Sequence, residues 1–289
     1  MTEDNRQHLK IAVVQPVTHA PPDDERNVAD AVRFIERSAE AGADFVAFPE
    51  TYPGPWRTPA TFDPTEALAQ AARRCGVYVV FGTLRPIDER RAYNAAVLAG
   101  PDGAEPETYL RTHPPGPWIY AGGDRWDFDY VAADRLPVFE TPLATVGLAI
   151  CSEVYMPEVV RSLALRGAEL IFLPAGTDKL RLWATWRTLI WARAIENLAV
   201  VVTSQNLFAL SERGLAMVAT PEEVLLEAVG PGLNVVTVDL ERCRALRDGR
   251  DTASSSRVEG AKAGVLSQWQ RPEMSEELYP REVVGDTSR

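Results

Sequence analysis

The sequence has few basic residues for its number of acidic ones, and it has almost no lysine. In 289 residues, 30 Lys and Arg stand against 41 Asp and Glu, which gives a formal net charge of −11 and a pI near 4.9. A domain that follows a phosphate backbone needs a basic patch or stripe, so we expect no nucleic-acid partner. Only Lys10, Lys179 and Lys262 are lysines, and arginine supplies almost all the positive charge.

Long apolar runs are also missing. No stretch approaches the roughly 18 apolar residues that indicate a membrane-spanning helix. The first ten residues, MTEDNRQHLK, contain no apolar segment of the kind found in signal peptides. The sequence therefore predicts a soluble, cytoplasmic protein with no membrane partner.

Cysteine and histidine are scarce and scattered. The cysteines are Cys75, Cys151 and Cys243, and the histidines are His8, His19 and His113. None of them falls at the spacing of a zinc site, and three cysteines do not make a disulfide framework. We expect no bound metal.

The apolar content is sufficient for a sizeable core. Hydrophobic residues make up 46% of the chain and aromatic residues 8%, which supports independent folding at this length. We find no low-complexity tract or short repeat, and apolar residues thin out beyond Arg244. These features predict a single domain over residues 1–270, followed by a C-terminal tail or arm over residues 271–289.

Short β-branched runs alternate with longer amphipathic stretches, which is typical of an α/β fold. The expected helices are 24–41, 64–75, 157–166 and 182–197. The expected strands are 10–15, 44–48, 77–84, 94–98, 107–113, 137–140, 145–150, 169–173 and 198–203, with more strand within 215–240. Both halves repeat strand, helix, strand, a pattern that suits two similar layers packed face to face.

The segment 114–137 interrupts this alternation and is rich in Gly, Pro and aromatic residues. A loop this long is usually functional or disordered. Its aromatic side chains, Trp118, Tyr120, Trp126 and Tyr130, can line a pocket for a planar or apolar group, or they can cover the sheet edge as ordinary packing.

Three segments carry residues suited to chemistry. They are Phe48-Pro49-Glu50, the run 109–113 around Arg111, and the run 147–153 around Cys151. Each lies at the predicted C-terminal end of a strand, the edge at which ligands bind in parallel sheets. An acid, a cation and a thiol are therefore expected to meet there, although they lie far apart in the sequence.

With these three segments in this order, the chain resembles the nitrilase superfamily of carbon-nitrogen hydrolases over roughly residues 9–240. The family pattern has Glu after Phe-Pro, Lys within Tyr-x-Lys-x-His, and Cys within Gly-x-x-Ile-Cys, followed by Pro-Glu and Arg. The corresponding residues of this chain are Glu50; Tyr109, Arg111 and His113; Gly147, Ile150 and Cys151; and Pro157, Glu158 and Arg161.

The resemblance implies a four-layer α-β-β-α sandwich that forms homo-oligomers, commonly dimers, and works without a cofactor. It also implies a small-molecule substrate, namely an amide, nitrile or carbamoyl compound, which is hydrolysed through a cysteine thioester. Cys151 would be the nucleophile and Glu50 the general base. The backbone amide of Ser152 and the cation would stabilise the oxyanion.

Arg111 stands where the family has its catalytic lysine. Arginine supplies a fixed charge and hydrogen-bond donors, but with a pKa above ~12 it cannot exchange a proton during the reaction. Lys179 follows a strand expected beside that of Cys151 and is a candidate substitute, although most lysines are simply solvated. The prediction therefore includes Arg111 as catalytic and Lys179 as substrate-binding.

Two assignments around Cys151 stay open. Glu153 either positions the thiol or the substrate, or makes a structural hydrogen bond. Many family members also use a second glutamate in the loop before the cysteine. In this chain that loop has no glutamate, and its aspartates are Asp124, Asp127, Asp129 and Asp134.

The leading functional hypothesis is a hydrolase that cleaves carbon-nitrogen bonds other than peptide bonds. One alternative is a binding protein on the same fold, in which Arg111 has abolished turnover. Another is an enzyme that passes the acyl group to an acceptor other than water. The sequence does not identify the substrate, and a cysteine at the end of an apolar strand is, without its motif, more often an inert buried thiol.

Overall fold

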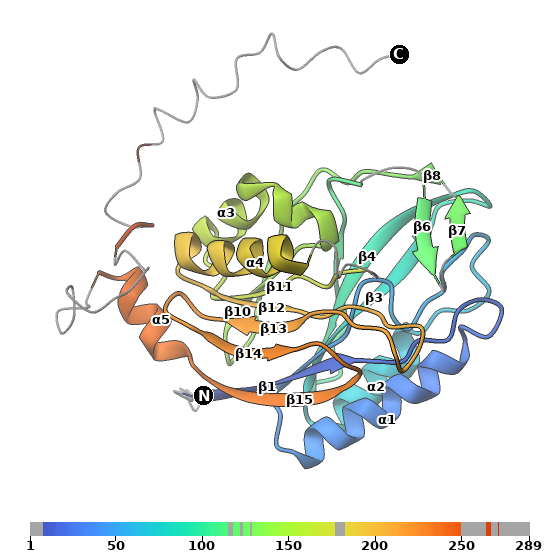
Figure 1. The fold of residues 1–289 in the computed structure, drawn as a ribbon, viewed down its shortest axis with the longest axis horizontal. Coiled ribbons are helices and arrows are strands. Elements are labelled where there is room, and N and C mark those ends of the chain that lie inside the picture. The colour runs from blue at the N-terminus through green and yellow to red at the C-terminus, as the bar shows by residue number, and fades with distance from the viewer. Residues whose placement is uncertain are drawn as a thin grey trace, which may run out of the picture.

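Two β-sheets pack face to face, and helices cover their outer sides (Figure 1). The computed structural model describes residues 8–114, 118–121, 124–127, 129–176, 183–249, 264–266 and 271. Of residues 118–121 and 124–127 it describes only the backbone. The helices are α1 (Arg26–Glu40), α2 (Thr65–Cys75), α3 (Pro157–Leu165), α4 (Trp183–Asn197) and α5 (Leu240–Arg247), with a 3-10 turn at Cys151–Tyr155. The strands are β1 (His8–Gln15), β2 (Phe45–Ala47), β3 (Tyr78–Pro86), β4 (Arg91–Ala99), β5 (Glu107–Leu110), β6 (Trp118–Ala121), β7 (Asp124–Asp127), β8 (Asp129–Tyr130), β9 (Val138–Glu140), β10 (Thr145–Leu148), β11 (Leu170–Phe172), β12 (Val200–Thr203), β13 (Ala216–Ala219), β14 (Val224–Ala228) and β15 (Gly232–Asp239).

The two sheets have similar strand arrangements. The first has the order β15-β1-β2-β3-β4-β5, with β8 beside β4, and the second has the order β14-β13-β12-β11-β10-β9. Strands β1, β2 and β3 are parallel, as are β10, β11 and β12. The other pairs are antiparallel, apart from the short parallel pair of β4 with β8. Parallel neighbours require crossover connections, which helices α1 to α4 supply. The repeat of strand, helix, strand predicted for each half is present.

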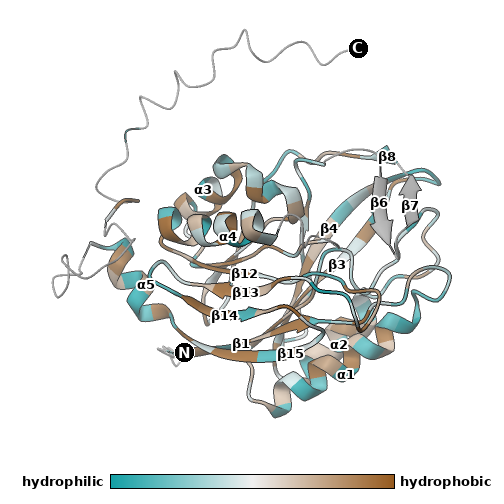
Figure 2. Cartoon of the chain, viewed as in Figure 1, coloured by the Kyte–Doolittle hydropathy of each residue, from teal (hydrophilic) through white to brown (hydrophobic). Residues whose placement is uncertain are grey.

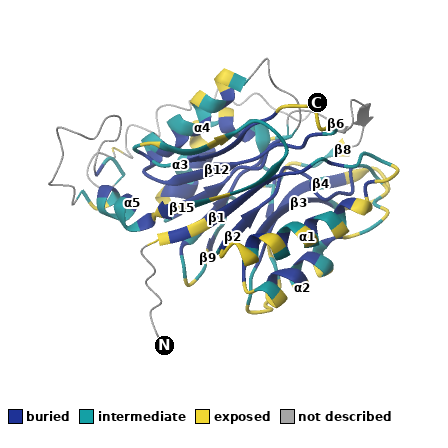
Figure 3. Ribbon diagram, turned by 60° about the horizontal axis from the view of Figure 1, so that its bottom comes forward, coloured by how far each residue is buried: buried dark blue, intermediate teal, exposed yellow. Residues whose placement is uncertain are grey.

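Apolar side chains fill the space between the sheets. Leu9 and Phe45 of the first sheet belong to the same buried cluster as Val146 and Phe172 of the second, and the rings of Phe45 and Phe172 lie 5.7 Å apart. Separate clusters fill the space under α1 and α2 and under α3 and α4. The central strands are buried while the helices keep one exposed face (Figure 3), and the helices carry hydrophilic residues among apolar ones (Figure 2). The predicted four-layer α-β-β-α sandwich is confirmed.

Two segments differ from the prediction. Within the loop 114–137, β6 pairs with β7 as a hairpin and β8 extends the first sheet. Helix α5 was not predicted. Its buried stripe consists of only Leu240, Cys243 and Leu246 among charged residues, and Asp239 caps its start by accepting a bond from the Arg242 amide at 3.1 Å. So narrow a stripe gives a weak helical pattern in the sequence.

The chain ends leave two predictions untested. Residue 271 is exposed, and residues 272–289 of the predicted tail lie outside the described residues. The single domain over residues 1–270 therefore stays a prediction, as does the homo-oligomer. In the parts of the chain that the structure describes, no helix has the length and apolar character needed to cross a membrane.

Candidate active site

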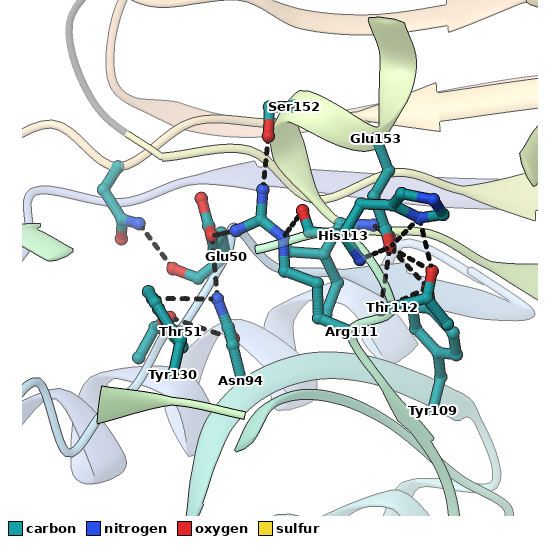
Figure 4. Close-up of polar contacts among 12 residues, drawn as sticks. Glu50, Thr51, Asn94, Tyr109, Arg111, Thr112, His113, Tyr130, Ser152 and Glu153 are labelled. Atoms are coloured by element: carbon teal, nitrogen blue, oxygen red, sulfur yellow. Dashed lines mark hydrogen bonds and ion pairs between the residues drawn. The ribbon is translucent and has the colours of Figure 1, made fainter. Parts of the chain in front are cut away.

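The structure brings the predicted acid, cation and thiol segments together between the two sheets (Figure 4). Glu50 follows β2, Arg111 follows β5 directly, and Cys151 opens the 3-10 turn after β10. Arg111 Nη1 donates to Glu50 Oε1 at 2.9 Å, and its Nη2 donates to Ser152 Oγ at 2.6 Å. Glu50 is 6% exposed and Arg111 is 1% exposed, so water screens their ion pair weakly.

A close approach of two backbones fixes the position of Glu50. A methyl group on Gly82 of β3 would lie 2.1 Å from the Thr51 nitrogen, so only glycine lets the Glu50 segment pack against the strand. Thr51 itself has φ of 52°, an unusual conformation for a residue other than glycine. From the segment that follows β12 of the second sheet, Asn206 Nδ2 donates to the Glu50 backbone carbonyl at 2.8 Å. The backbone of the Glu50 segment is therefore held by contacts with β3 and with this segment.

Cys151 also has a backbone in the left-handed region, with φ of 52°. Its amide donates to the Pro174 carbonyl at 2.8 Å. Burial and the charge of Glu50 raise the pKa of the thiol to about 12, although Arg111 and the amide of Gly176 act in the opposite direction. The resting thiol is protonated at neutral pH, and it needs a base before it can act as a nucleophile.

Arg111 keeps its charge in this buried position. Burial acts to lower the pKa of its guanidinium, but Glu50 and Cys151 favour the cation, and the net direction is upward. Its Nε donates to the His113 carbonyl at 3.2 Å. Three of its five N–H groups are thus used in bonds to Glu50, Ser152 and His113.

Glu153 is fully buried and accepts hydrogen bonds from two segments of the chain. Its Oε1 accepts from the Tyr109 hydroxyl at 2.7 Å, from the amide and hydroxyl of Thr112 at 2.9 and 2.7 Å, and from the His113 amide at 3.0 Å. Its Oε2 accepts from the Ile150 amide at 2.7 Å. These contacts tie the Arg111 segment to the Cys151 segment. They favour the positioning and structural alternatives for Glu153 over contact with substrate.

Other predicted site residues lie elsewhere or outside the described residues. Lys179 is not among the described residues, and the side chains of Trp118 and Tyr120 are not described either. The side chain of Ser152 accepts a bond from Arg111, and the role predicted for the Ser152 backbone amide at the oxyanion stays a prediction. Of the loop aspartates, Asp129 and Asp134 have exposed side chains near Arg90 and Arg135.

The sequence did not point to Asn94 and Thr51 as site residues, and it gave Tyr130 only as a pocket or packing residue. Asn94 Nδ2 donates to Glu50 Oε1 at 2.8 Å and to the Tyr130 hydroxyl at 3.3 Å. The signal for Asn94 was a single amide within the otherwise apolar strand β4, where a buried polar group requires partners. Within the described ranges, no group of three or more His, Cys, Asp or Glu side chains could hold a metal ion.

A thiol beside a carboxylate and a fixed cation is an arrangement suited to cysteine acyl transfer. The sequence profile of the carbon-nitrogen hydrolase family matches residues 10–248, and the chain belongs to that family. An omega-amidase of Xenopus tropicalis is 26% identical over 239 residues, which cover 76% of this chain and 84% of that protein. A human deaminated glutathione amidase is 29% identical over 263 residues, which cover 83% of this chain and 80% of that protein.

Among solved structures, a mutant of the Nesterenkonia AN1 amidase of the nitrilase superfamily has the same fold. Its TM-score is 0.73 at 23% sequence identity, and the match covers 94% of this chain and 98% of the other. This similarity agrees with the four layers described above.

The buried acceptor Glu153 generates a stability prediction. Glu153→Gln replaces an acceptor oxygen with an NH2 group that must face donors, so at least one buried group loses its partner. We expect a loss of about 1–3 kcal/mol in the free energy of unfolding, measured by urea denaturation. Glu105→Gln, at an exposed position in the connection between β4 and β5, is the control. An unchanged midpoint for Glu153→Gln would contradict the role assigned to this carboxylate.

The electrostatics of Cys151 generate a prediction of pH dependence. Because its pKa is raised to about 12, labelling of Cys151 by iodoacetamide should still accelerate above pH 10, as followed by peptide mass spectrometry. Glu50→Gln removes the anionic charge that raises this pKa and leaves Arg111, so the labelling profile should move to lower pH. Labelling of Cys75 in the same samples is the internal control. A plateau near pH 8.5 in the parent, typical of a free thiol, would refute the assignment.

Proposed function

We propose that the protein is an amidase that hydrolyses a small amide through a thioester on Cys151. The observation that carries the proposal is the half-buried Cys151 thiol beside the Glu50 carboxylate, which is itself paired with Arg111 at 2.9 Å. Two curated relatives in the family are amidases by name. This favours an amide over the nitrile and carbamoyl compounds that the sequence leaves open.

The first half of the reaction uses Glu50 and Cys151. Glu50 takes the thiol proton as sulfur bonds to the amide carbon, and the carbonyl electron pair moves to oxygen. When the carbonyl reforms, the carbon-nitrogen bond breaks, and Glu50 returns the proton to the departing nitrogen. The products of this half are a thioester on Cys151 and ammonia or an amine.

The second half restores the enzyme. Water attacks the thioester carbon while Glu50 takes one of its protons. The carbon-sulfur bond then breaks, sulfur recovers the proton, and the carboxylic acid leaves. Each half passes through an oxyanion, which the Ser152 backbone amide and the N–H groups of Arg111 not used within the described chain are suited to stabilise.

Arg111 takes the electrostatic part of the role that lysine has in the family. Its guanidinium cannot donate a proton at any step, because it is protonated throughout. Proton transfer therefore falls to Glu50 and Cys151 alone, and Arg111 contributes a fixed positive charge. Its bonds to Ser152 and to the His113 carbonyl fix the guanidinium plane beside the thiol.

The probes for this proposal come from the chemistry of a related amidase. A mutant of the Nesterenkonia AN1 amidase has been solved in complex with butyramide. Another mutant has been solved with the acetamide moiety of fluoroacetamide attached covalently to the active-site cysteine. Small amides of this kind are the first compounds to try here.

Intact-protein mass spectrometry after incubation with butyramide, acrylamide and fluoroacetamide tests the proposal. We expect an adduct in the parent protein that is absent in Cys151→Ala, together with release of ammonia from butyramide. Arg111→Lys should turn over about 10-fold more slowly or worse, because an ammonium cannot bond Glu50, Ser152 and the His113 carbonyl at once. Ligand binding without adduct or turnover would instead favour a binding protein, and an adduct that resists water would favour transfer to another acceptor.

A substitution at Gly176 is expected to lower activity without lowering stability. A methyl group at this position would lie 2.9 Å from Glu50 Oε2, so Gly176→Ala should push the carboxylate away from the thiol. We expect turnover to fall about 100-fold, as when a catalytic group is misplaced by 1 Å, at an unchanged melting temperature. Gly230→Ala, with open space around the added methyl group, is the matched control. Normal turnover in Gly176→Ala would contradict the role of Glu50 Oε2.

A further inference from the structure

The two oxygens of Glu50 have different surroundings. Oε1 accepts from Arg111 Nη1 at 2.9 Å and from Asn94 Nδ2 at 2.8 Å. Oε2 lies toward Gly176, whose amide donates to the Cys151 thiol. One oxygen is thus fully engaged by donors, and the other lies on the side of the nucleophile.

Arg111 alone does not fix this orientation. Arginine and a carboxylate commonly pair through two parallel hydrogen bonds, which would engage both Glu50 oxygens and turn Oε2 away from the thiol. In this site the second guanidinium nitrogen bonds to Ser152, and Asn94 occupies the remaining position on Oε1. Asn94 and Ser152 together therefore keep the ion pair to a single hydrogen bond, Ser152 from the Arg111 side and Asn94 from the Glu50 side.

The amide of Asn94 is itself held in one orientation (Figure 4). The Thr51 hydroxyl donates to Asn94 Oδ1 at 3.3 Å, and the Tyr130 hydroxyl accepts from Asn94 Nδ2 at 3.3 Å. Turned by 180°, the amide would present its oxygen to Glu50 and its NH2 group to Thr51. Because a carboxylate only accepts hydrogen bonds, Glu50 requires the NH2 group to face it. The bonds to the Thr51 and Tyr130 hydroxyls then hold the amide in that orientation.

The surroundings of Tyr130 make it a dependable acceptor for this bond. Tyr130 packs against a small apolar cluster of Trp56, Leu84 and Ala92. Burial, followed by the negative charge of Glu50, raises the pKa of the phenol. The hydroxyl therefore stays neutral over the working pH range and adds no second anion beside the carboxylate.

We propose that Asn94, oriented by Thr51 and Tyr130, is a positioning residue that reserves Glu50 Oε2 for proton exchange with Cys151. The inference rests on the proposed function, in which Glu50 is the general base. Asn94 acts on the reaction through Glu50 and makes no contact with the substrate.

The test compares the parent with Asn94→Leu, which has a similar volume and no donor, and with Tyr130→Phe, which keeps the ring. For butyramide hydrolysis we expect kcat to fall about 100-fold in Asn94→Leu, in the range of a lost general base, and several-fold in Tyr130→Phe. KM should change less than about threefold in both, because ground-state binding is not affected. Tyr93→Phe, the adjacent tyrosine on the same strand, is the control and should match the parent.

Crystal structures of the same variants give a second readout that does not depend on turnover. In Asn94→Leu we expect Glu50 to rotate and pair through both oxygens with Arg111. Tyr130→Phe provides the same comparison if Asn94→Leu does not fold. A Glu50 carboxylate in the parental position in the folded variants, or a loss that appears in KM alone, would overturn the inference.

The proposed function fails separately from this inference. Without a Cys151 adduct or turnover in the parent, the amidase proposal falls, while the position of Glu50 in the variant crystals still decides the role of Asn94. A parent that hydrolyses butyramide, with an Asn94→Leu variant of equal kcat, would leave the amidase intact and refute the positioning role.

Discussion

The ion pair between Arg111 and Glu50 is the interaction on which the site depends. Both side chains are almost completely buried, so each would carry a large desolvation cost without the other, and breaking such a pair costs about 3–5 kcal/mol. The cost is offset only when the remaining donors and acceptors also find partners. Asn94 supplies the second donor to Glu50, and Ser152 and the His113 carbonyl supply acceptors to Arg111. The hydrogen-bond network around the pair is thus a condition for burying the charges as well as a device for catalysis.

The fold meets this condition by fixing the positions of the backbone segments that carry Glu50, Arg111 and Cys151. Gly82 permits the close approach of the Glu50 segment to β3, and the carboxylate of Glu153 ties the strand ends that carry Arg111 and Cys151. Glu50 and Arg111 belong to the first sheet and Cys151 to the second, so the site exists only when the two sheets are packed together. The apolar cluster between the sheets therefore determines the distance between acid and thiol.

Much of this could be predicted from the sequence. Alternating β-branched and amphipathic runs predicted the strands and helices of both halves, and motif order indicated that Glu50, Arg111 and Cys151 would meet. The partners of these residues were harder to predict, because their roles arise from tertiary contacts without a local signal. Asn94 reads as one polar residue in an apolar strand, and Glu153 gives no sign that it will accept bonds from Tyr109, Thr112 and His113. Helix α5 was not predicted because its buried stripe contains only three residues, too few for a clear helical pattern in the sequence.

Arginine in place of lysine changes how the site must be built. An ammonium is a compact charge whose donors rotate freely, whereas a guanidinium is a planar fork that fits a carboxylate through two bonds. With this preference satisfied, Arg111 would hold both oxygens of Glu50 and leave neither of them for the thiol. Three other hydrogen bonds prevent this. Arg111 Nη2 donates to Ser152, and Arg111 Nε donates to the His113 carbonyl. Asn94 donates to Glu50 Oε1, the oxygen that also accepts from Arg111. The geometry that lets a fixed cation remain beside the base is thus made by neutral neighbours, whose amide and hydroxyl groups add no charge to the buried site.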